Sequence, residues 1–132
     1  TSCMNSKPER MISKLRDVEK IEIVINRDFY GDSYQIIEKD PETIKFLLES
    51  FTLWGAGGKP EYPIERFNCN GKLIFHLKNN AILVLDIDLL SGQSSDSGFR
   101  IERKGRVEYT FFTKATDQIL VGIICDHLAA DI

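Results

Sequence analysis

Three runs of β-forming residues, separated by two pairs of turn residues, constrain the fold of this chain more than any other feature. The runs cover residues 64–69, 72–77 and 81–88, and the turns fall at Asn70-Gly71 and near Asn79-Asn80. Asn-Gly is the strongest short-range hairpin signal, because both residues readily adopt the positive φ angles of a tight hairpin turn. The sequence therefore predicts two linked hairpins, and with them an antiparallel sheet.

Two of these runs are apolar on both of their faces. Leu73, Ile74 and Phe75 are consecutive, and so are the five apolar residues 81–85. A strand with two apolar faces is typical of the middle of a sheet that is covered on both sides. We therefore expect the second and third runs to lie at the centre of the sheet, with another element packed on each face.

The other segments show helical spacing or strand alternation of their apolar residues. These patterns predict helices at 7–19, at 41–53 after Asp40, and from an N-cap at Thr116 to about Leu128, and strands at 21–25 and 34–38. The order is helix, two strands, helix, five strands, helix, without the regular alternation of parallel sheets. The predicted fold class is α+β, with a mainly antiparallel sheet of five to seven strands packed with N-terminal, middle and C-terminal helices.

The last predicted hairpin has a register that follows from its side chains. A three-residue loop, Arg103-Lys104-Gly105, pairs Ile101 with Val107, Phe99 with Tyr109 and Arg100 with Glu108. Like or complementary side chains then lie opposite each other, which stabilises a sheet. We expect Gly105 to take the left-handed position that such a loop requires.

Size and composition are those of one ordinary globular domain. The chain has 132 residues, of which 42% are hydrophobic and 28% charged, enough to bury a core without disulfides or metal. We assign 7–132 to a single domain and 1–6 to a flexible N-terminal segment. The net charge of -3 gives no general attraction to phosphate backbones, so we expect no nucleic-acid partner. No apolar run approaches the length of a membrane-spanning helix, about 20 residues.

The three cysteines, Cys3, Cys69 and Cys125, lack the CxxC or CxxH spacing of zinc sites, so we expect no metal and no cofactor. Thr1-Ser2-Cys3 and the polar stretch after it resemble the end of a bacterial lipoprotein signal, with Cys3 as the lipidated residue. That resemblance implies a lipid anchor in the cell envelope; the alternative is a cytoplasmic protein. Cys69 and Cys125 would then be free to form a disulfide. We favour two buried thiols instead.

Candidate catalytic groups centre on His76, on a predicted central strand. Approach of Cys69 or Cys125 to this imidazole would give a thiol–imidazole pair or an incomplete metal site. Asp86 and Asp88 are two residues apart on a strand and so share a face, where they could bind a cation or share a proton. A solvated charge pair is the commoner role for such carboxylates, and a structural role is the commoner one for the histidine.

Two loops and one hairpin tip carry the residues that we expect to contact a partner. Loop 54–63 carries Trp54, Lys59 and Tyr62, the polar loop 91–98 carries Ser94 and Asp96, and the tip carries Arg103 and Lys104. Aromatic side chains on loops supply much of the contact energy at protein interfaces. The alternative for Trp54 and Tyr62 is that both fold back to cover the core.

These observations favour a non-catalytic domain that binds another protein. In size, and in lacking a catalytic motif, the chain is similar to small bacterial inhibitor and immunity lipoproteins. That resemblance implies a protein that binds or inhibits a partner protein. The alternative is an enzyme or a small-molecule-binding domain that uses a cleft around His76, with Cys69, Cys125 or the pair Asp86 and Asp88.

Overall fold

The structure is a computed structural model that describes residues 8–26, 31–89 and 96–130. In these residues six strands, β1 (Val18–Ile25), β2 (Tyr34–Glu38), β3 (Gly71–Leu77), β4 (Ile82–Asp88), β5 (Gly98–Arg103) and β6 (Arg106–Phe111), form one antiparallel sheet in the order β2-β1-β3-β4-β5-β6. The helices are α1 (Pro8–Ser13), α2 (Pro41–Ser50), α3 (Lys114–Ala130) and the short 3-10 helix η2 (Ile64–Arg66). The predicted α+β class, with an antiparallel sheet and N-terminal, middle and C-terminal helices, is confirmed.

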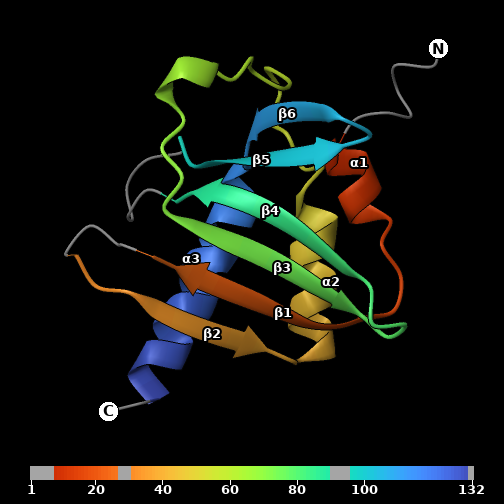
Figure 1. The fold of residues 1–132 in the computed structure, drawn as a ribbon, viewed down its shortest axis with the longest axis vertical. Coiled ribbons are helices and arrows are strands. Elements are labelled where there is room, and N and C mark those ends of the chain that lie inside the picture. The colour runs from red at the N-terminus through yellow and green to blue at the C-terminus, as the bar shows by residue number, and fades with distance from the viewer. Residues whose placement is uncertain (1–7, 27–30, 90–95, 131–132) are drawn as a thin grey trace.

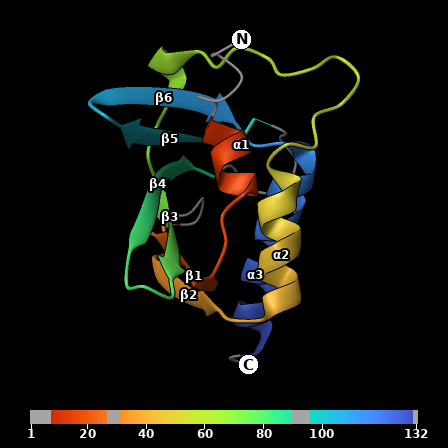
Figure 2. The ribbon, with the colours of Figure 1, turned by 90° about the vertical axis from the view of Figure 1, so that its right-hand side faces the viewer.

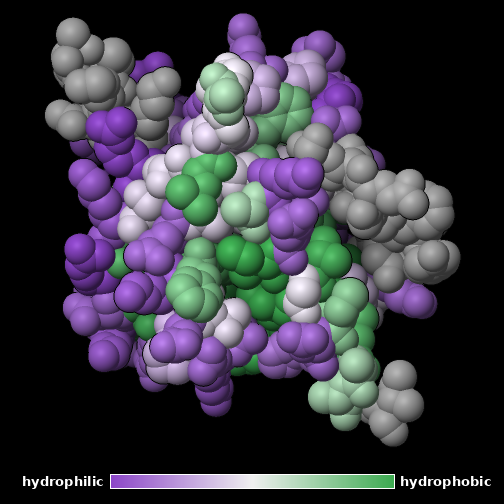
Figure 3. Space-filling view, turned by 180° about the vertical axis from the view of Figure 1, so that it is seen from behind, coloured by the Kyte–Doolittle hydropathy of each residue, from purple (hydrophilic) through white to green (hydrophobic). Residues whose placement is uncertain are grey.

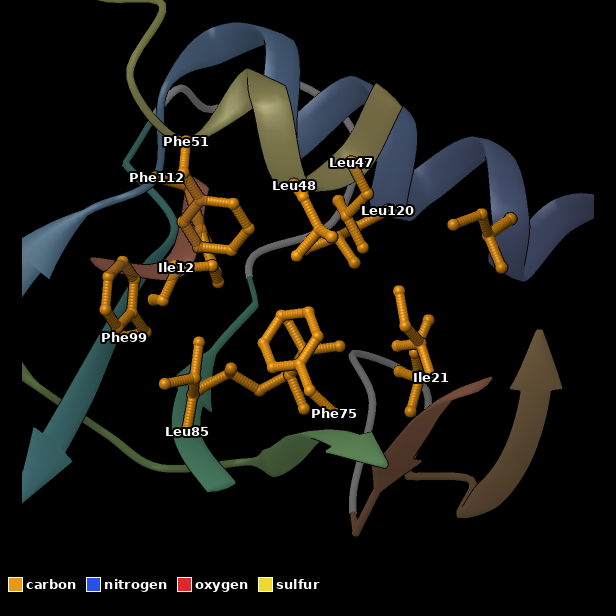
Figure 4. Close-up of a cluster of buried hydrophobic side chains, with 14 of the residues drawn as sticks. Ile12, Ile21, Leu47, Leu48, Phe51, Phe75, Leu85, Phe99, Phe112 and Leu120 are labelled. Carbon is orange, nitrogen blue, oxygen red and sulfur yellow. The ribbon is translucent and has the colours of Figure 1, made fainter. Parts of the chain in front are cut away.

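The molecule has two layers. Helices α2 and α3 run antiparallel to each other and lie on one face of the sheet, which we call the inner face (Figures 1 and 2). Side chains alternate along each strand, so that Ile21, Ile23 and Ile25 all point inward and are buried. Phe51, just after α2, packs between the helix layer and the sheet beside Phe112 (Figure 4), with its ring edge-on to Phe75 at 6.2 Å. The apolar stripe of α2 is thus the link between the two layers.

Side-chain caps fix where the two long helices begin. Asp40 caps α2 as predicted, because its carboxylate accepts the Thr43 backbone N–H at 3.0 Å. The predicted cap of α3 at Thr116 is wrong: Thr113 Oγ1 accepts the Thr116 N–H at 3.0 Å, and the helix begins at Lys114. Thr116 is instead buried against α2, where its hydroxyl oxygen lies 2.6 Å from that of Ser50.

The N-terminal helix is shorter than the predicted 7–19. It ends at Ser13, Asp17 turns the chain with a φ of 61°, and β1 begins at Val18. The helical spacing of the apolar residues continues past Ser13, but the alternation that includes Val18 belongs to a strand paired with β3. Pairing in the sheet therefore overrides the helical pattern here.

The predicted strand at 64–69 is also wrong, because these residues form η2 and an irregular segment. Asn70-Gly71 is therefore not a hairpin turn. Gly71 is instead the first residue of β3, between Ile25 of β1 and Ile87 of β4. A Cβ atom on Gly71 would lie 2.2 Å from the Val24 carbonyl oxygen. This glycine thus permits the close approach of two strands rather than a tight turn.

The β5–β6 hairpin differs by one residue from the predicted register. Its turn has two residues, Lys104 and Gly105, with φ angles of 51° and 76°, as a type I′ turn requires. The pairs are Arg100 with Tyr109, Ile101 with Glu108 and Arg103 with Arg106. A shift of one residue reverses the face of every side chain on β6. Tyr109 and Phe111 therefore lie on the outer face of the sheet, opposite the helices.

An irregular segment covers part of the outer face of the sheet and leaves the rest open. Residues 54–70, which we call the strap, leave α2, pass around the β6 end of the sheet and cross its outer face on the way to β3 (Figures 1 and 2). The central strands were expected to be covered on both faces, but the described helices cover only the inner one. Leu73 and Leu85 are fully buried there, whereas Ile74 and Val84 on the outer face are only half-buried.

Candidate functional site

A row of paired charges crosses the outer face of the sheet. Lys72 of β3 lies opposite Asp86 of β4, which lies opposite Arg100 of β5. Lys72 Nζ is 2.6 Å from Asp86 Oδ1, and Arg100 Nη2 is 2.9 Å from Asp86 Oδ2. Burial raises the pKa of Asp86, but hydrogen bonds and charge from Lys72 and Arg100 outweigh it, so the pKa lies below its ordinary value. Asp86 is therefore a fixed anion between two cations.

A second polar pair, His76 of β3 and Glu22 of β1, lies nearer the β2 edge of the sheet. His76 Nε2 is 2.9 Å from Glu22 Oε1, and the Gln35 amide donates to the other oxygen of this carboxylate. The hydrogen bond with His76 is the main cause that lowers the pKa of Glu22. Half-buried Val24 and Ile74 lie beside these groups on the same face. The outer face thus mixes β-branched side chains with charges that are already paired.

The sheet opens between β4 and β5. These strands pair only from Asp86–Arg100 to Asp88–Gly98, and then diverge (Figure 1). The opening forms a groove of about 350 Å³ on the outer face, lined by Lys72, Ile82, Leu83, Val84, Asp86, Arg100 and Glu102. A second hollow of about 260 Å³ shares Asp86, Arg100 and Glu102 and continues to Val107 and Tyr109. We call the two together the outer-face groove.

Two exposed apolar side chains lie along this groove. Ile82 on β4 is 57% exposed and Val107 on β6 is 50% exposed. Helix α1 contacts β5 outside the lining of the groove, where Arg103 Nη1 is 3.7 Å from Met11 Sδ. The groove itself has a charged floor at Asp86 and Arg100 and apolar side chains along its length.

The strap closes the other end of the outer face with an aromatic cluster. Tyr62 is buried, with its ring centre 4.6 Å from that of Phe111. Phe67 lies edge-on to Tyr109 at 5.3 Å, and the Arg100 guanidinium lies 4.8 Å from the centre of the Phe67 ring. Arg100 thus connects the strap to the charged row.

A buried carboxylate holds the strap in place. Asp88 Oδ2 accepts the Asn68 backbone N–H at 3.2 Å and the Tyr62 hydroxyl at 3.5 Å. Burial raises the pKa of Asp88 above its ordinary value, against the lowering effect of these hydrogen bonds. Burial and the Asp88 charge likewise raise the pKa of Tyr62. Nearby, the Asn70 amide bonds both backbone groups of Leu89, at 2.8 and 2.9 Å.

The residues predicted to contact a partner lie in several different environments. Trp54 is half-buried, and Lys59 Nζ is 2.7 Å from the buried Glu9 carboxylate. Tyr62 is buried with its ring against Phe111 on the outer face, so the ring is not exposed to a partner. It folds back as the alternative expected, but onto the outer face of the sheet rather than over the core beneath the helices. Arg103 is bonded to Glu108 at 2.7 Å, and Lys104 is exposed at the hairpin tip.

Asp96, the described residue of loop 91–98 that we singled out, lies 3.9 Å from Arg66 of the strap. Ser94 lies outside the described residues, and so does Cys3. Cys69 and Cys125 are both exposed and both free. The favoured prediction of two buried thiols is therefore wrong, and the alternative of a disulfide between them is not formed either. Cys69 is near the end of the strap and Cys125 is on α3, and neither thiol is part of the core.

The groups of the alternative catalytic cleft do not converge. His76 contacts Glu22, Asp86 contacts Lys72 and Arg100, and Asp88 contacts the strap. The Cys69 thiol donates to the Gly71 carbonyl at 3.3 Å. Within the described residues, no three His, Cys, Asp or Glu side chains are grouped so that they could hold a metal ion. The prediction that Asp86 and Asp88 share a face agrees with the structure, but each has a separate structural partner.

From the sequence, Arg100 and Val107 were named only as partners in the last hairpin, and Ile82 and Glu102 were not assigned to a site. The sequence did contain one signal for Ile82. Residues of the apolar run 81–85 alternate between the two faces of the strand, so if helices cover only one face, the apolar side chains on the other face are left exposed. The position of Arg100 beside Asp86 depends on the β4–β5 pairing, which no local pattern reports.

Comparison with known proteins adds no family to these observations. In the part of the chain that the structure describes, no helix is both long and apolar enough to cross a membrane. No family model, no curated protein sequence and no solved structure matches the chain.

Proposed function

We propose that this chain is a non-catalytic domain that binds another protein through the outer-face groove. The observation that carries the proposal is the groove itself, where exposed Ile82 and Val107 flank the charged pair of Asp86 and Arg100. Apolar side chains beside a few fixed charges are typical of non-obligate protein interfaces. An open, elongated groove also suits a segment of a protein better than an enclosed small molecule.

The electrostatics of the groove support binding over catalysis. A general acid or base needs a pKa near the working pH, whereas the lowered pKa of Asp86 keeps this carboxylate ionised and paired with Lys72 and Arg100. Such a row presents fixed charges that can orient a partner. Within this class we propose an inhibitor or immunity role, in which the open face covers a functional surface of its target.

The test compares two isoleucines of equal exposure. Ile82 lies in the groove and Ile64 in η2 of the strap, and each is 57% exposed. Wild type, Ile82→Asp and Ile64→Asp are immobilised, and proteins recovered from native extract are quantified by mass spectrometry. We expect Ile82→Asp to reduce recovery of a specific partner by about tenfold or more, as burial of a charge at an interface costs more than about 1.4 kcal/mol, whereas Ile64→Asp recovers it as wild type does.

Each other outcome contradicts the proposal in a defined way. Loss of the partner with Ile64→Asp alone would move the surface to the strap, near the predicted contacts Trp54 and Lys59. Equal recovery by all three proteins, or recovery of nothing specific, would remove the groove as a binding surface. Unchanged melting temperatures confirm that both variants are folded, and titration of the purified partner then measures the affinity directly.

A further inference from the structure

The β4–β5 opening leaves backbone groups of β4 without a partner strand. The Leu77 N–H donates to the Ala81 carbonyl at 2.9 Å, so Ala81 and every second residue after it face β3. Backbone N–H and C=O groups alternate in direction along an antiparallel strand. Ile82 and Val84 therefore direct their backbone groups toward β5, yet pairing with β5 begins only at Asp86.

The facing edge of β5 is open at the matching position. The register pairs Asp86 with Arg100, and two residues further along it Val84 would lie opposite Glu102. The strands diverge instead (Figure 1), so in the described part of the chain these two residues have no strand partner across the opening. An unpaired row of backbone donors and acceptors is a template for another strand.

This edge of β4 lacks the features that commonly protect an open edge. Lysine, proline or a β-bulge usually prevents the addition of a strand. Residues 81–85 are all apolar, and β4 pairs with β3 without a bulge from Ile82 to Ile87. The β-branched side chains of Ile82 and Val84 favour the extended conformation, so the edge is a preformed and unprotected strand.

The described helices offer no such template. Figure 3 shows that apolar surface also lies in the middle of the helix side, over α2 and α3. Backbone groups of a helix are hydrogen-bonded within the helix, so a partner there could contact only side chains. The β4–β5 opening is different because it presents both apolar side chains and unpaired backbone groups.

The opening extends from the outer face into the layer of the sheet. Leu83 lies opposite Phe75 of the core, so its side chain points to the inner face. It is nevertheless only half-buried and lines the groove together with Ile82 and Val84 of the outer face. The groove thus reaches side chains on both faces of β4, as required for a strand that lies beside β4 rather than on top of the sheet.

The charges of the groove indicate the chemistry of its occupant. Lys72, Asp86 and Arg100 are paired with one another. Glu102 is exposed, lines both hollows and forms no ion pair with another described residue. Lys104 lies beyond it at the hairpin tip, outside the lining of either hollow. A lysine or arginine of a partner segment is the side chain that complements the Glu102 carboxylate.

From these observations we infer that the groove binds an extended segment of the partner protein, which pairs with β4 as an additional strand. The inference rests on the proposed function and names the kind of partner that the groove takes. Backbone hydrogen bonds to Ile82 and Val84 supply the affinity, and alternate side chains supply the specificity. The segment carries apolar, β-branched side chains at every second position and a basic side chain beside Glu102.

Residue-resolved hydrogen exchange of the free chain tests whether the edge is open. The amides of Leu83 and Leu85 are paired with β3, so those of Ile82 and Val84 should exchange about tenfold faster or more. Slow exchange at Ile82 and Val84 means that a second copy or another part of the chain already covers the edge, and it overturns the inference.

A library of short linear peptides, displayed on phage, tests the occupant. Wild type should enrich peptides with apolar side chains in a two-residue period and one basic residue, and Glu102→Lys should favour an acidic residue at that position. A bound peptide should slow the exchange of the Ile82 and Val84 amides. Enrichment of no peptide, or of peptides with helical spacing, overturns the inference.

A proline at position 82 separates this inference from the proposed function. Ile82→Pro removes the N–H that faces the opening but keeps an apolar side chain, and proline is tolerated at the first residue of a strand. It should weaken binding of an enriched peptide about tenfold or more. Ile82→Val keeps both the N–H and an apolar side chain, so it should bind the peptide as wild type does.

The pull-down from native extract then distinguishes the two failures. Loss of the partner with Ile82→Asp but not with Ile82→Pro overturns strand addition and leaves the proposed function intact. Recovery of the partner by Ile82→Asp overturns the proposed function itself. Circular dichroism and the melting temperature show whether Ile82→Pro is folded; if it is not, the exchange of the Ile82 and Val84 amides in peptide-bound wild type decides the question.

Discussion

At the scale of single residues, Asp88 is the group that most clearly links burial to pH. It is a buried carboxylate whose pKa is raised by burial, and it holds Tyr62 and Asn68 of the strap. Between the unfolded pKa, about 3.9, and the raised folded pKa, the folded state binds more protons than the unfolded state. The contribution of Asp88 to stability is therefore complete below the unfolded pKa and is lost as the pH rises through the folded pKa.

Replacement of Asp88 by asparagine should remove this pH dependence. The amide keeps an oxygen for the Asn68 N–H but has no proton to lose, so the free energy of unfolding of Asp88→Asn relative to wild type should rise with pH across that window. Urea unfolding from about pH 3 to pH 8 measures the difference. Asp17→Asn is the control, because Asp17 is exposed and its φ of 61° suits asparagine. Parallel wild-type and Asp88→Asn curves would contradict the prediction.

The sequence predicted the local structural roles of single residues better than it predicted how exposed their side chains are. Asp40 was predicted as a cap because its role depends only on the next three residues. Tyr62, Cys69 and Cys125 have exposures set by where the strap and α3 lie in space, which the local sequence does not determine. Gly71 is a further example. The dipeptide Asn70-Gly71 predicts a turn, but in the structure Gly71 allows β1 and β3 to approach each other closely.

At the scale of elements, the strap depends on a glycine in the strand beneath it. A Cβ atom on Gly98 of β5 would lie 2.5 Å from the Tyr62 ring and 2.8 Å from the Thr110 carbonyl oxygen. Gly98→Ala should therefore displace Tyr62 and lower stability by about 1–3 kcal/mol, as overpacking does. The matched control is Gly122→Ala on α3, where no atom lies within 4 Å. Gly122→Ala should raise stability by about 0.5–1 kcal/mol.

A double-mutant cycle assigns the effect to the strap. In a Tyr62→Ala background the cost of Gly98→Ala should fall, because the contact with the ring is gone and only the contact with Thr110 remains. Chemical unfolding gives the four free energies. Equal costs of Gly98→Ala with and without the Tyr62 ring would show that the strap does not press on β5 at this position.

Errors in the predicted elements have physical causes that lie in the tertiary structure. Pairing with β3 ended the first helix early, and the aromatic contacts of Tyr62 and Phe67 held residues 64–69 off the sheet. The β5–β6 hairpin was predicted with the right strands, but the turn took two residues because Lys104 accepts a positive φ. Helix α2 and strand β2 depend on local spacing and were placed within a few residues.

For the whole molecule, the sequence predicted the fold class but not the candidate site. The spacing of apolar residues and the identity of turn residues are enough to predict an antiparallel sheet with three helices. Each helix or strand shows in its own sequence which of its faces is apolar. The outer-face groove arises where β4 and β5 diverge, and residues from four strands, β3 to β6, line it. Such long-range packing leaves no periodic signal, so the groove could be found only in three dimensions.

The same long-range packing predicts that the described elements unfold together. Phe51 lies at the junction of the helix layer and the sheet, with its ring 5.6 Å from Phe99 of β5 and 5.8 Å from Phe112 (Figure 4). Phe51→Ala should lower the free energy of unfolding by about 3–5 kcal/mol, and Phe51→Leu by less. Phe46→Ala, on α2 but 57% exposed, should have little effect on the free energy of unfolding.

Two spectroscopic probes test whether Phe51→Ala destabilises the strap and the sheet together. Trp54, the only tryptophan of the chain, reports on the strap by fluorescence, and far-ultraviolet circular dichroism reports on the helices and strands. Because Phe51 contacts the strands that the strap covers, both transitions should shift together to lower denaturant in Phe51→Ala, as they do in a two-state domain. A Trp54 transition that stays in place, or that precedes the other in wild type, would mean that the strap unfolds independently and that the outer-face groove changes shape before the core is lost.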